Sequence, residues 1–421
     1  MSYDPPMSTP EADLARQGEE KIAWARAHMP ILAALEEELN PYQPLAGRRI
    51  AMCIHLEAKT ARLAQALKAL GAEVALASSN PLSTQDDVVA ALGGEVAAHA
   101  RRGASEAEYT ACLGQVLSIR PHLVLDDGGD LAALLHGERV DAGEEVVGLC
   151  EETTTGLVRL RQLARKGQLR FPVLAVNDAR MKHLFDNRHG TGQSVWDAVM
   201  RATNLLLAGK QVLVVGYGWC GRGIAQRGRG LGASVVVAEV DPVRAAEAVL
   251  EGFTVAPVRE AITGADFVIT ATGCRNAVGW EDLMHAKDGA ILANAGHFDV
   301  EIDVRSLRAR VQGRRVRDGV EEFILSGGRR VYLLAQGRLV NLVAGDGHPA
   351  EIMDLSFAVQ LLSLVWLARE RVALPPGIYP VPEEVDGEVA RRFLESRGVR
   401  IDDLTPDQRT YLGWEAKSGR G

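Results

Sequence analysis

Short apolar runs alternate with segments of helical apolar spacing along most of the chain. After Arg48 the sequence reads RRIAMCIHL, which is typical of a buried strand, and then TARLAQALKALG, in which apolar residues recur every three or four positions. The runs AEVALAS and PHLVLDDGG repeat the strand pattern further along the chain. This alternation predicts an α/β fold with a mainly parallel sheet.

Two breaks interrupt this pattern. The first, NDARMKHLFDNRHGTG at 177–192, precedes a predicted helix (SVWDAVMRATNLLLAG) and a predicted strand (KQVLVVGYG). The second, VAGDGHP at 343–349, precedes EIMDLSFAVQLLSLVWLARE, which has helical spacing. We therefore predict a first domain at 1–185, an inserted domain at 186–346, a return segment at 347–374 and a small C-terminal tail at 375–421. Within the tail, PPGIYPVP is predicted to be a linker and EVARRFLESRG part of a helix.

Composition narrows the class of protein. The 421 residues exceed the usual single core, and 47% hydrophobic with 24% charged residues describes a globular chain. The net charge is −8 (47 Lys and Arg against 55 Asp and Glu), so we expect no nucleic-acid partner. No apolar run reaches the roughly 18 residues of a membrane span, and no leader pattern opens the chain, so we expect a cytoplasmic protein without a membrane partner. Its five cysteines are widely spaced without a C-x-x-C pair, which favours reduced thiols and no metal site.

A glycine motif carries the first chemical signal. VLVVGYGWCGRG places Gly216, Gly218 and Gly221 as G-x-G-x-x-G between a predicted strand and the helical IAQRGRGLG. Glycines there let the backbone approach a pyrophosphate at a helix N-terminus. The next strand ends at Glu239, where a carboxylate can bind ribose hydroxyls and repel a 2′-phosphate, so NAD is the expected cofactor. Arg244, five residues further on, weakens the preference for NAD over NADP; alternatively, it is a solvent-exposed charge on a helix.

Five polar strings follow other predicted strands or lie in the breaks. Singly, each is also typical of a turn, a helix cap or a core histidine; together they can converge on one cleft at the strand ends. They are HLEAKT at 55–60, DDGGD at 126–130, EETTTG at 151–156, Lys182 with Asp186 and Asn187, and NAGHFD at 294–299.

With these strings the chain resembles the S-adenosyl-L-homocysteine hydrolase family. The match runs from Ile22 to Gly413 and includes SSNPLSTQDD, KHLFDN, GYGWCGRG, NAGHFDVEID, GRLVNL and LTPDQRTYLG. The resemblance implies a substrate domain, an inserted Rossmann NAD-binding domain, a small C-terminal tail and a homotetramer. It also implies a hydrolase of the methyl cycle in one-carbon metabolism. In that family, tightly bound NAD oxidises the ribose 3′-hydroxyl, the ketone acidifies C4′–H, homocysteine is eliminated, water adds, and the ketone is reduced again; the resemblance implies the same sequence of steps here.

The resemblance assigns roles to individual residues. Lys182 and Asp186 would bind and deprotonate the 3′-hydroxyl, and Asp127 would take the C4′ proton. His55 and His297 would flank C5′, protonating sulfur and activating water. Substrate would further contact Glu57, Lys59, Glu152, Asn177 and His348, the last in the family's hinge segment. The cofactor would contact Thr153, Thr154, Thr155, Asn187, Gly216, Gly218, Gly221, Glu239, Arg244, Thr272 and Asn341.

The first string departs from the family's usual His-x-Thr-x-Glu or Gln. Here it reads His55-x-Glu57-x-Lys59, which reverses the polarity that fits adenine, because a carboxylate accepts and an ammonium only donates. This order complements hypoxanthine. The main hypothesis is hydrolysis of S-adenosyl-L-homocysteine, and the alternative is the same reaction on S-inosyl-L-homocysteine. Alternatively, Glu57 and Lys59 pair with each other, and adenine is bound by backbone or water.

Two smaller departures from the family pattern are also present, and two rival functions stand beside it. Thr191 stands where many members have cysteine, and the end GWEAKSGRG lacks the Lys- and Tyr-rich tail that reaches a neighbour's NAD.

One rival is a two-domain NAD-dependent hydroxy-acid dehydrogenase, which does not account for EETTTG or LDDGGDL. The other is a catalytically silent nucleoside sensor, against which the retained Lys182 and Asp186 count.

Overall fold

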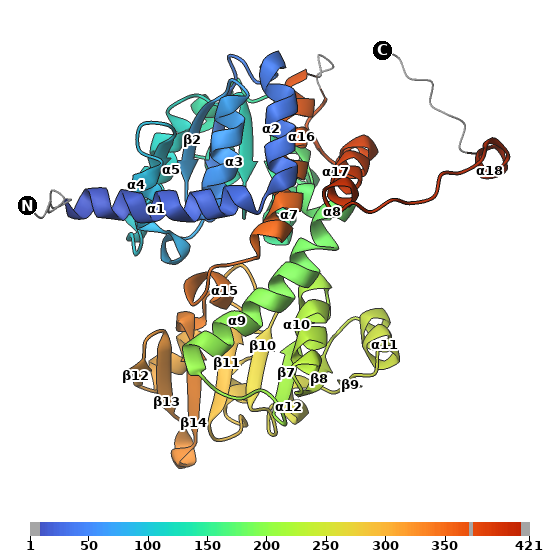
Figure 1. Ribbon diagram of the computed structural model, residues 1–421. Coiled ribbons are helices and arrows are strands. Elements are labelled where there is room, and N and C mark those ends of the chain that lie inside the picture. Colours follow the sequence, from blue (N-terminus) through green and yellow to red (C-terminus); the bar gives the residue numbers. More distant parts are fainter. Residues whose placement is uncertain (1–8, 370–373, 414–421) are drawn as a thin grey trace, which may run out of the picture.

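The computed structural model describes residues 9–369 and 374–413. It shows two α/β lobes, one above the other in Figure 1, which are joined by α9 (Thr191–Thr203) and by the segment that leads into α16 (Ala350–Arg369). The upper lobe is built from both ends of the chain and the lower lobe from the middle. The predicted α/β class with an inserted domain is therefore confirmed.

Seven parallel strands form sheet A of the upper lobe, in the order β15-β6-β5-β4-β1-β2-β3. The order reverses between β1 and β4, and loops that leave such a switch point in opposite directions open a crevice at the carboxyl ends of the strands. The strands are β1 Arg49–Cys53, β2 Glu73–Ala77, β3 Ala97–His99, β4 Leu123–Asp126, β5 Gly148–Glu151, β6 Pro172–Leu174 and β15 Gly377–Tyr379.

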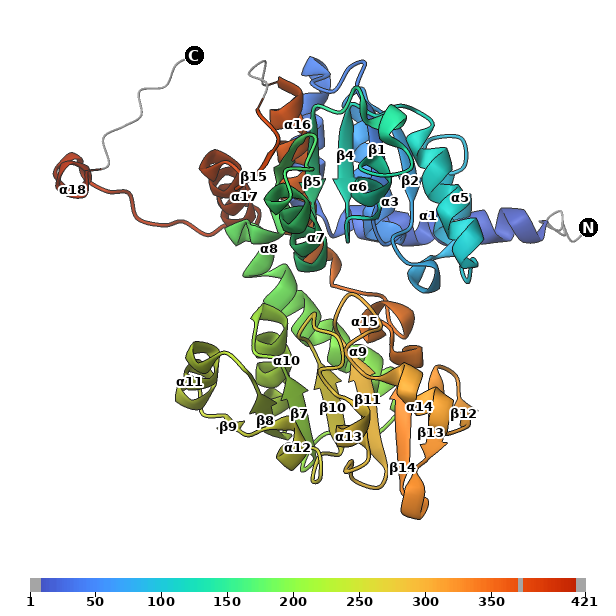
Figure 2. The ribbon, with the colours of Figure 1, turned by 180° about the vertical axis from the view of Figure 1, so that it is seen from behind.

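Helices cover both faces of sheet A (Figures 1 and 2). Along β1, Ile50 and Met52 enter one core, while Ala51 and Cys53 enter the core on the opposite face. A strand buried on both faces must be apolar throughout, which explains the uninterrupted run in the sequence. One face carries α1 Pro10–Ala27, α2 Pro30–Leu39, α3 Ala58–Ala69, α4 Asp86–Ala91 and α16; the other carries α5 Glu106–Leu117, α6 Asp130–Leu135 and α7 Thr154–Arg165.

Eight strands form sheet B of the lower lobe, in the order β12-β13-β14-β11-β10-β7-β8-β9. All neighbours are parallel except that β13 runs antiparallel to β12 and β14. From β9 to β14 this is the Rossmann order, with its switch point between β7 and β10. The strands are β7 Gln211–Val215, β8 Ser234–Ala238, β9 Thr254–Val255, β10 Phe267–Thr270, β11 Ala290–Asn294, β12 Gly313–Arg317, β13 Val320–Ile324 and β14 Arg330–Leu334. The helices are α10 Trp219–Gly230, α11 Pro242–Leu250, α12 Val258–Ala261, α13 Trp280–Leu283, α14 Val304–Arg310 and α15 Val340–Val343.

The C-terminal segment differs from its sequence-based prediction. A linker is expected at PPGIYPVP, but its Gly377–Tyr379 forms β15, which pairs with the otherwise free edge of β6. Two helices follow, α17 (Glu383–Ser396) and α18 (Pro406–Tyr411). Val385 and Val389 of α17 are buried in the first-lobe core, whereas α18 lies away from the body in Figure 1. Most of GWEAKSGRG lies outside the described residues.

Helix α16 is the one described helix long and apolar enough to cross a membrane by length and composition. Its most apolar stretch is 67% buried, and the helix packs against α2, α3, α8 (Arg180–His183) and α17. Asp354 of α16 is buried and accepts hydrogen bonds from Ile31 N and Leu32 N at the start of α2. These contacts identify α16 as a core helix of the first lobe.

A second carboxylate caps the short helix α8. Its N-cap residue, Ala179, offers no side-chain acceptor. Asp386 of α17 supplies one, because its two carboxylate oxygens accept from Arg180 N at 2.7 Å and Met181 N at 2.9 Å. Orphan N–H groups at a helix start are thereby satisfied from a distant element. After α8 a single π-helical turn, Asp186–Gly190, leads into α9.

Candidate active site

The cleft between the lobes lies at the carboxyl ends of both sheets. It has a volume of about 1150 Å³ and receives residues from the switch points of sheet A and sheet B. His55 follows β1 and Asp127 follows β4, and these strands pair directly, with Cys53 opposite Asp126. The sequence-predicted loops therefore meet because their strands are neighbours.

Asp127 lies between two histidines at one end of this cleft. Its Oδ2 is 3.6 Å from His55 Nε2, and its Oδ1 is 3.8 Å from His297 Nδ1. His297 comes from the second lobe, after β11, and approaches Gly128 so closely that a Cβ there would lie 2.7 Å from its Nε2. The ligand atoms of the three residues lie within 4.8 Å of one another, a set that could also hold a transition-metal ion.

The hydrogen bonds of His55 assign its protonation. Ser83 Oγ donates to Asn80 O at 2.9 Å, so it accepts from His55 Nδ1 at 2.7 Å. His55 Nε2 then carries the lone pair, and this buried atom has no hydrogen-bond partner in the described protein. Burial lowers the pKa of His55 to about 4 despite the nearby Asp127. The imidazole is therefore neutral at neutral pH, with an acceptor facing the site.

Lys182 lies in a second cluster, among carboxyl groups. Its Nζ is 3.3 Å from Glu152 Oε1, 3.6 Å from Asp186 Oδ2 and 3.1 Å from Asn187 Oδ1. Asn177 Oδ1 is 3.4 Å from the same nitrogen. All these side chains are buried or half-buried, so the cluster combines one ammonium with two carboxyl groups out of water.

The cluster divides its charge unequally. Burial would lower the pKa of Lys182, but Asp186 and Glu152 outweigh it and raise that pKa above its ordinary value. Burial would raise the pKa of Asp186, but Lys182 and then His348 hold it well below its ordinary value. Burial dominates at Glu152 and raises its pKa to about 7. Glu152 is thus the member of the cluster that exchanges a proton near neutral pH.

Glu57 and Lys59 form an ion pair in the lining of the cleft. Lys59 Nζ lies 2.6 Å from Glu57 Oε2 and donates to Asp346 O at 2.9 Å. Glu57 is also the N-cap of α3 and accepts from Lys59 N and Thr60 N. Both side chains line the cleft, so the pair lies next to the space that a ligand would occupy.

Two buried carboxyls support the floor of the cleft. Glu151 Oε1 accepts from Gly128 N at 2.9 Å and Thr153 N at 3.1 Å, which fixes the DDGG and EETTTG turns against each other. A Cβ on Gly156 would lie 2.2 Å from that carboxyl, so only glycine fits there. Burial raises the pKa of Asp126 to about 7 and that of Glu151 well above its ordinary value.

The glycine loop lies after β7 at the start of α10. Gly216 has φ +98° and Gly218 lines the cleft, whereas Gly221 does not line it and packs beneath Gly216, where a Cβ would lie 1.9 Å from Gly216 O. Glu239 accepts from Tyr217 N at 2.7 Å and lines the cleft with Arg244. The loop therefore has the open backbone that a pyrophosphate requires.

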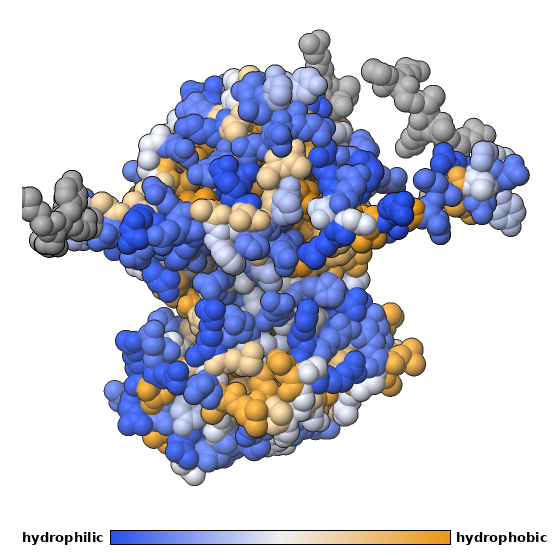
Figure 3. All heavy atoms as spheres, viewed as in Figure 1, coloured by the Kyte–Doolittle hydropathy of each residue, from blue (hydrophilic) through white to orange (hydrophobic). Residues whose placement is uncertain are grey.

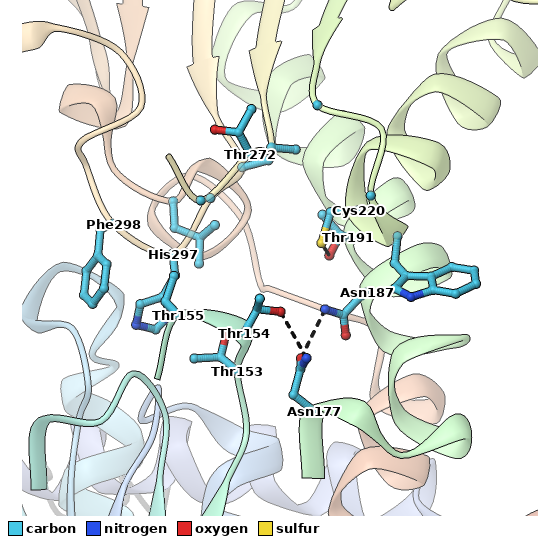
Figure 4. Close-up of a pocket in the computed structure, with 18 of the residues that line it drawn as sticks. Thr153, Thr154, Thr155, Asn177, Asn187, Thr191, Cys220, Thr272, His297 and Phe298 are labelled. Atoms are coloured by element: carbon cyan, nitrogen blue, oxygen red, sulfur yellow. Dashed lines mark hydrogen bonds between the residues drawn. The ribbon is translucent and has the colours of Figure 1, made fainter. Parts of the chain in front are cut away.

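Residues of both lobes face the opposite part of this cofactor pocket (Figure 4). Thr154 Oγ1 accepts from Asn177 Nδ2 at 3.0 Å, and Asn187 Nδ2 donates to Asn177 Oδ1 at 3.3 Å. Thr155 Oγ1 and Asn341 Oδ1 are buried, line the cleft and have no hydrogen-bond partner in the described protein. Such unpaired polar atoms fit a cofactor that brings its own amide and hydroxyl groups, as NAD does.

His348 connects the two segments that join the lobes. Its Nδ1 lies 3.0 Å from Asp186 Oδ1, and its Nε2 lies 3.2 Å from Thr191 Oγ1. Thr191 Oγ1 in turn lies 3.6 Å from Cys220 Sγ, and Figure 4 shows the two side chains together. A thiol therefore lies beside Thr191, on the neighbouring glycine loop.

The structure brings all the sequence-predicted site residues to the cleft except Gly221, which supports the loop from below. Two further residues, which the sequence patterns did not reveal, bind the predicted site residues through hydrogen bonds. Gln360 of α16 bonds Glu152 at 2.5 Å, and Glu301 accepts from Thr272 N and Gly273 N at 2.8 Å. Glu301 lies within the quoted string NAGHFDVEID, whereas Gln360 has no sequence signal beyond a polar residue on an apolar helix face.

The Rossmann sheet, the glycine loop and the cleft at its edge define a two-domain NAD-binding enzyme. Comparison with known proteins identifies the family of this enzyme. The family model described as S-adenosyl-L-homocysteine hydrolase matches residues 8–146, and that of its NAD binding domain matches residues 187–347. The chain belongs to the S-adenosyl-L-homocysteine hydrolase family, and its cofactor is NAD.

Individual relatives carry two different substrate names. The chain is 54% identical to an adenosylhomocysteinase of Thermotoga maritima, over 94% of this chain and 99% of the relative. It is 53% identical to an S-inosyl-L-homocysteine hydrolase of Methanopyrus kandleri, over 96% of each chain. Among solved structures, a dipicolinate synthase from Bacillus halodurans has a TM-score of 0.51 at 14% identity, covering 78% of this chain and 100% of that one, which shows the fold alone.

Proposed function

We propose that this protein reversibly hydrolyses S-adenosyl-L-homocysteine to adenosine and L-homocysteine. The observation that carries the proposal is that one cleft holds Lys182 among carboxyls on the cofactor side and Asp127 between two histidines at its other end. The first cluster suits oxidation of a ribose hydroxyl, and the second suits proton transfers at C4′ and C5′. NAD supplies the hydride acceptor when it is bound.

The first cluster binds and deprotonates the 3′-hydroxyl. Lys182 is an ammonium, so it donates to the 3′-oxygen and stabilises negative charge there. Lys182 passes the hydroxyl proton on to Glu152, whose pKa is about 7. Asp186 keeps Lys182 charged and is itself held by His348 and by Ser356 Oγ at 2.7 Å. Asn177 and Asn187 orient the ammonium.

The second cluster removes the C4′ proton and exchanges the group at C5′. Asp127 is the C4′ base, since a ketone at C3′ makes that hydrogen acidic. The neutral His55, with its free Nε2 acceptor, takes a proton from the incoming water. His297 protonates the leaving sulfur. Because His297 comes from the other lobe, this cluster is complete only when the lobes are close.

A specific observation favours a second candidate substrate, S-inosyl-L-homocysteine. Glu57 accepts two backbone N–H bonds at the start of α3, which fix the orientation of its side chain in the cleft. The N1–H of hypoxanthine can donate to it, while Lys59 donates to the oxo group. Against this, the pair at 2.6 Å also satisfies itself, which leaves adenine to backbone or water. The names of the relatives include both substrates.

The test supplies S-adenosyl- and S-inosyl-homocysteine separately and compares rates of homocysteine release. We expect turnover of at least one substrate without net consumption of added NAD. Lys182→Ala and Asp186→Ala should lose the NADH absorbance that appears when substrate is added. Stoichiometric NADH formation in bulk would instead support a dehydrogenase, and nucleoside binding without any turnover would support a sensor.

We further propose that the protein is a cytoplasmic homotetramer that serves the methyl cycle. Exposed apolar residues on and next to α11 support assembly: Val240 is 99%, Val243 74% and Leu250 89% exposed. Figure 3 shows apolar surface over this helix. Light scattering of the holoenzyme tests the assembly, and a monomer at micromolar concentration would contradict it.

A further inference from the structure

The amino-acid end of the proposed substrate needs its own recognition. A homocysteine thioether carries a carboxylate and an ammonium beyond the sulfur atom, and a planar carboxylate is best bound by the fork of an arginine. The residues discussed above surround the base, the ribose and C5′. None of them is a free cation beyond C5′.

Four lysine or arginine side chains of the described residues line the cleft: Lys59, Arg159, Lys182 and Arg244. Lys59 is paired with Glu57, and Lys182 lies between Glu152 and Asp186. Arg244 lies beside Gly218 of the glycine loop, in the cofactor half. Elimination leaves Arg159 for the amino-acid end.

Arg159 lies next to the cluster of His55, Asp127 and His297, which is proposed to act at C4′ and C5′. Its Nη1 donates to Gly128 O and to Asp130 Oδ1, both at 2.6 Å, and Gly128 adjoins both Asp127 and the ring of His297. The guanidinium is therefore anchored one residue from the C4′ base. If the sulfur of a homocysteine thioether lies between His55 and His297, its carboxylate extends toward Arg159.

The anchoring leaves a donor edge free. Both hydrogen bonds run through Nη1, and within the described chain neither Nε nor Nη2 has a partner. The side chain is 38% exposed, and Arg159 is one of the residues that line the cleft. Asp130 is itself fixed, because its Oδ2 accepts from Tyr109 Oη at 2.8 Å. The guanidinium is thus preorganised with two N–H groups left for a ligand.

We propose that Arg159 binds the carboxylate of homocysteine and so selects amino-acid thiols over simple thiols. The proposal rests on the proposed function and names a substrate-binding residue for it. Hydrogen bonds to charged groups are strong, so we expect loss of this fork to weaken homocysteine binding by about ten- to a hundredfold.

The experiment measures the synthetic direction, with the holoenzyme, adenosine or inosine, and either homocysteine or 3-aminopropane-1-thiol, which lacks only the carboxylate. Arg159→Gln should raise KM for homocysteine roughly ten- to a hundredfold, leave KM for the nucleoside unchanged, and leave the reaction with 3-aminopropane-1-thiol unchanged. Arg159→Lys, which keeps the charge without the fork, should fall between. Arg161→Gln, two residues away and paired with exposed Asp178, is the matched control.

Two outcomes would overturn the proposal. If Arg159→Gln lowers kcat equally with both thiols, the residue only holds the Gly128 turn. If it changes neither, the carboxylate binds elsewhere. Failure of the unmodified enzyme to join either nucleoside to homocysteine would instead contradict the proposed function.

Discussion

Lys59 Nζ lies 2.6 Å from Glu57 Oε2, so the two residues that depart from the family's usual base string form one buried ion pair. The pair presents an acceptor and a donor side by side in the cleft. Whether it reads the purine edge can be tested by restoring the usual residues.

We expect Glu57→Thr combined with Lys59→Glu to shift preference toward the adenosyl substrate. Threonine also caps a helix, so α3 keeps its N-cap. Each unpaired polar group costs about 1–3 kcal/mol, so the ratio of kcat/KM for the two substrates should change roughly ten- to a hundredfold per mismatch. The two mismatches share one ring and need not add. Lys68→Gln, at the exposed end of α3, reproduces the net charge change of −1 and is the control. An unchanged ratio would show that these residues do not read the base.

The purified protein should carry NAD that survives gel filtration, because the glycine loop and Glu239 hold it from one side and unpaired Thr155 and Asn341 atoms from the other. Gly221→Ala should abolish retention, since the new Cβ would lie 1.9 Å from Gly216 O. Gly230→Ala, later in α10 and with open space around it, should retain the cofactor. Nicotinamide released by denaturation is the measurement, and equal retention by both variants would contradict the loop's role.

The rate of 3′-oxidation should rise with pH through about 7. Burial raises the pKa of Glu152 to about 7, so its carboxyl is protonated below that pH and cannot accept the hydroxyl proton. Glu152→Gln should remove this limb and lower the rate by about 10²–10⁴-fold, the usual contribution of a general base. Gln360→Leu, which removes a donor to the carboxylate, should move the limb to higher pH. Single-turnover NADH absorbance measures the rate; a limb that persists in Glu152→Gln belongs to another group.

Asp386→Ala should destabilise α8 and slow 3′-oxidation. The lost cap is worth about 0.5–2 kcal/mol, and α8 carries Lys182. Asp386→Asn keeps one acceptor oxygen and should recover part of both losses. Glu384→Ala, exposed on the same helix, is the matched control. Thermal midpoint and the rate of NADH appearance are the measurements. Equal behaviour of Asp386→Ala and Glu384→Ala would show that the cap does not position Lys182.

Sequence patterns predicted the elements whose environment is uniform. The runs 50–53 of β1 and 123–125 of β4 are buried on both faces and apolar without interruption, and polar strings mark the ends of both strands. β15 escaped prediction because three residues between prolines carry no such run. It forms because β6 offers a free edge, which no local pattern records.

The same distinction holds in the candidate site. His55, Asp127 and Lys182 lie in family strings and could be found there. Gln360 and Asp386 act on Glu152 and α8 from helices more than 200 residues away in the chain, and only the folded structure joins them. Pairing of Glu57 with Lys59 was one of two interpretations that hydrogen-bonding capacity alone left open, and the geometry shows that the two side chains are in contact.

The contact of Asp386 with α8 also orders events during synthesis. Its carboxylate caps a helix whose first residue, Arg180, leaves the ribosome 206 residues earlier. The strand β15 and the helix α17 are made after the whole inserted lobe. A nascent chain can therefore fold its dinucleotide domain and acquire cofactor well before Asp386 caps α8, the helix that carries Lys182. The helix that carries Lys182 therefore gains its cap only after the inserted lobe has been synthesised.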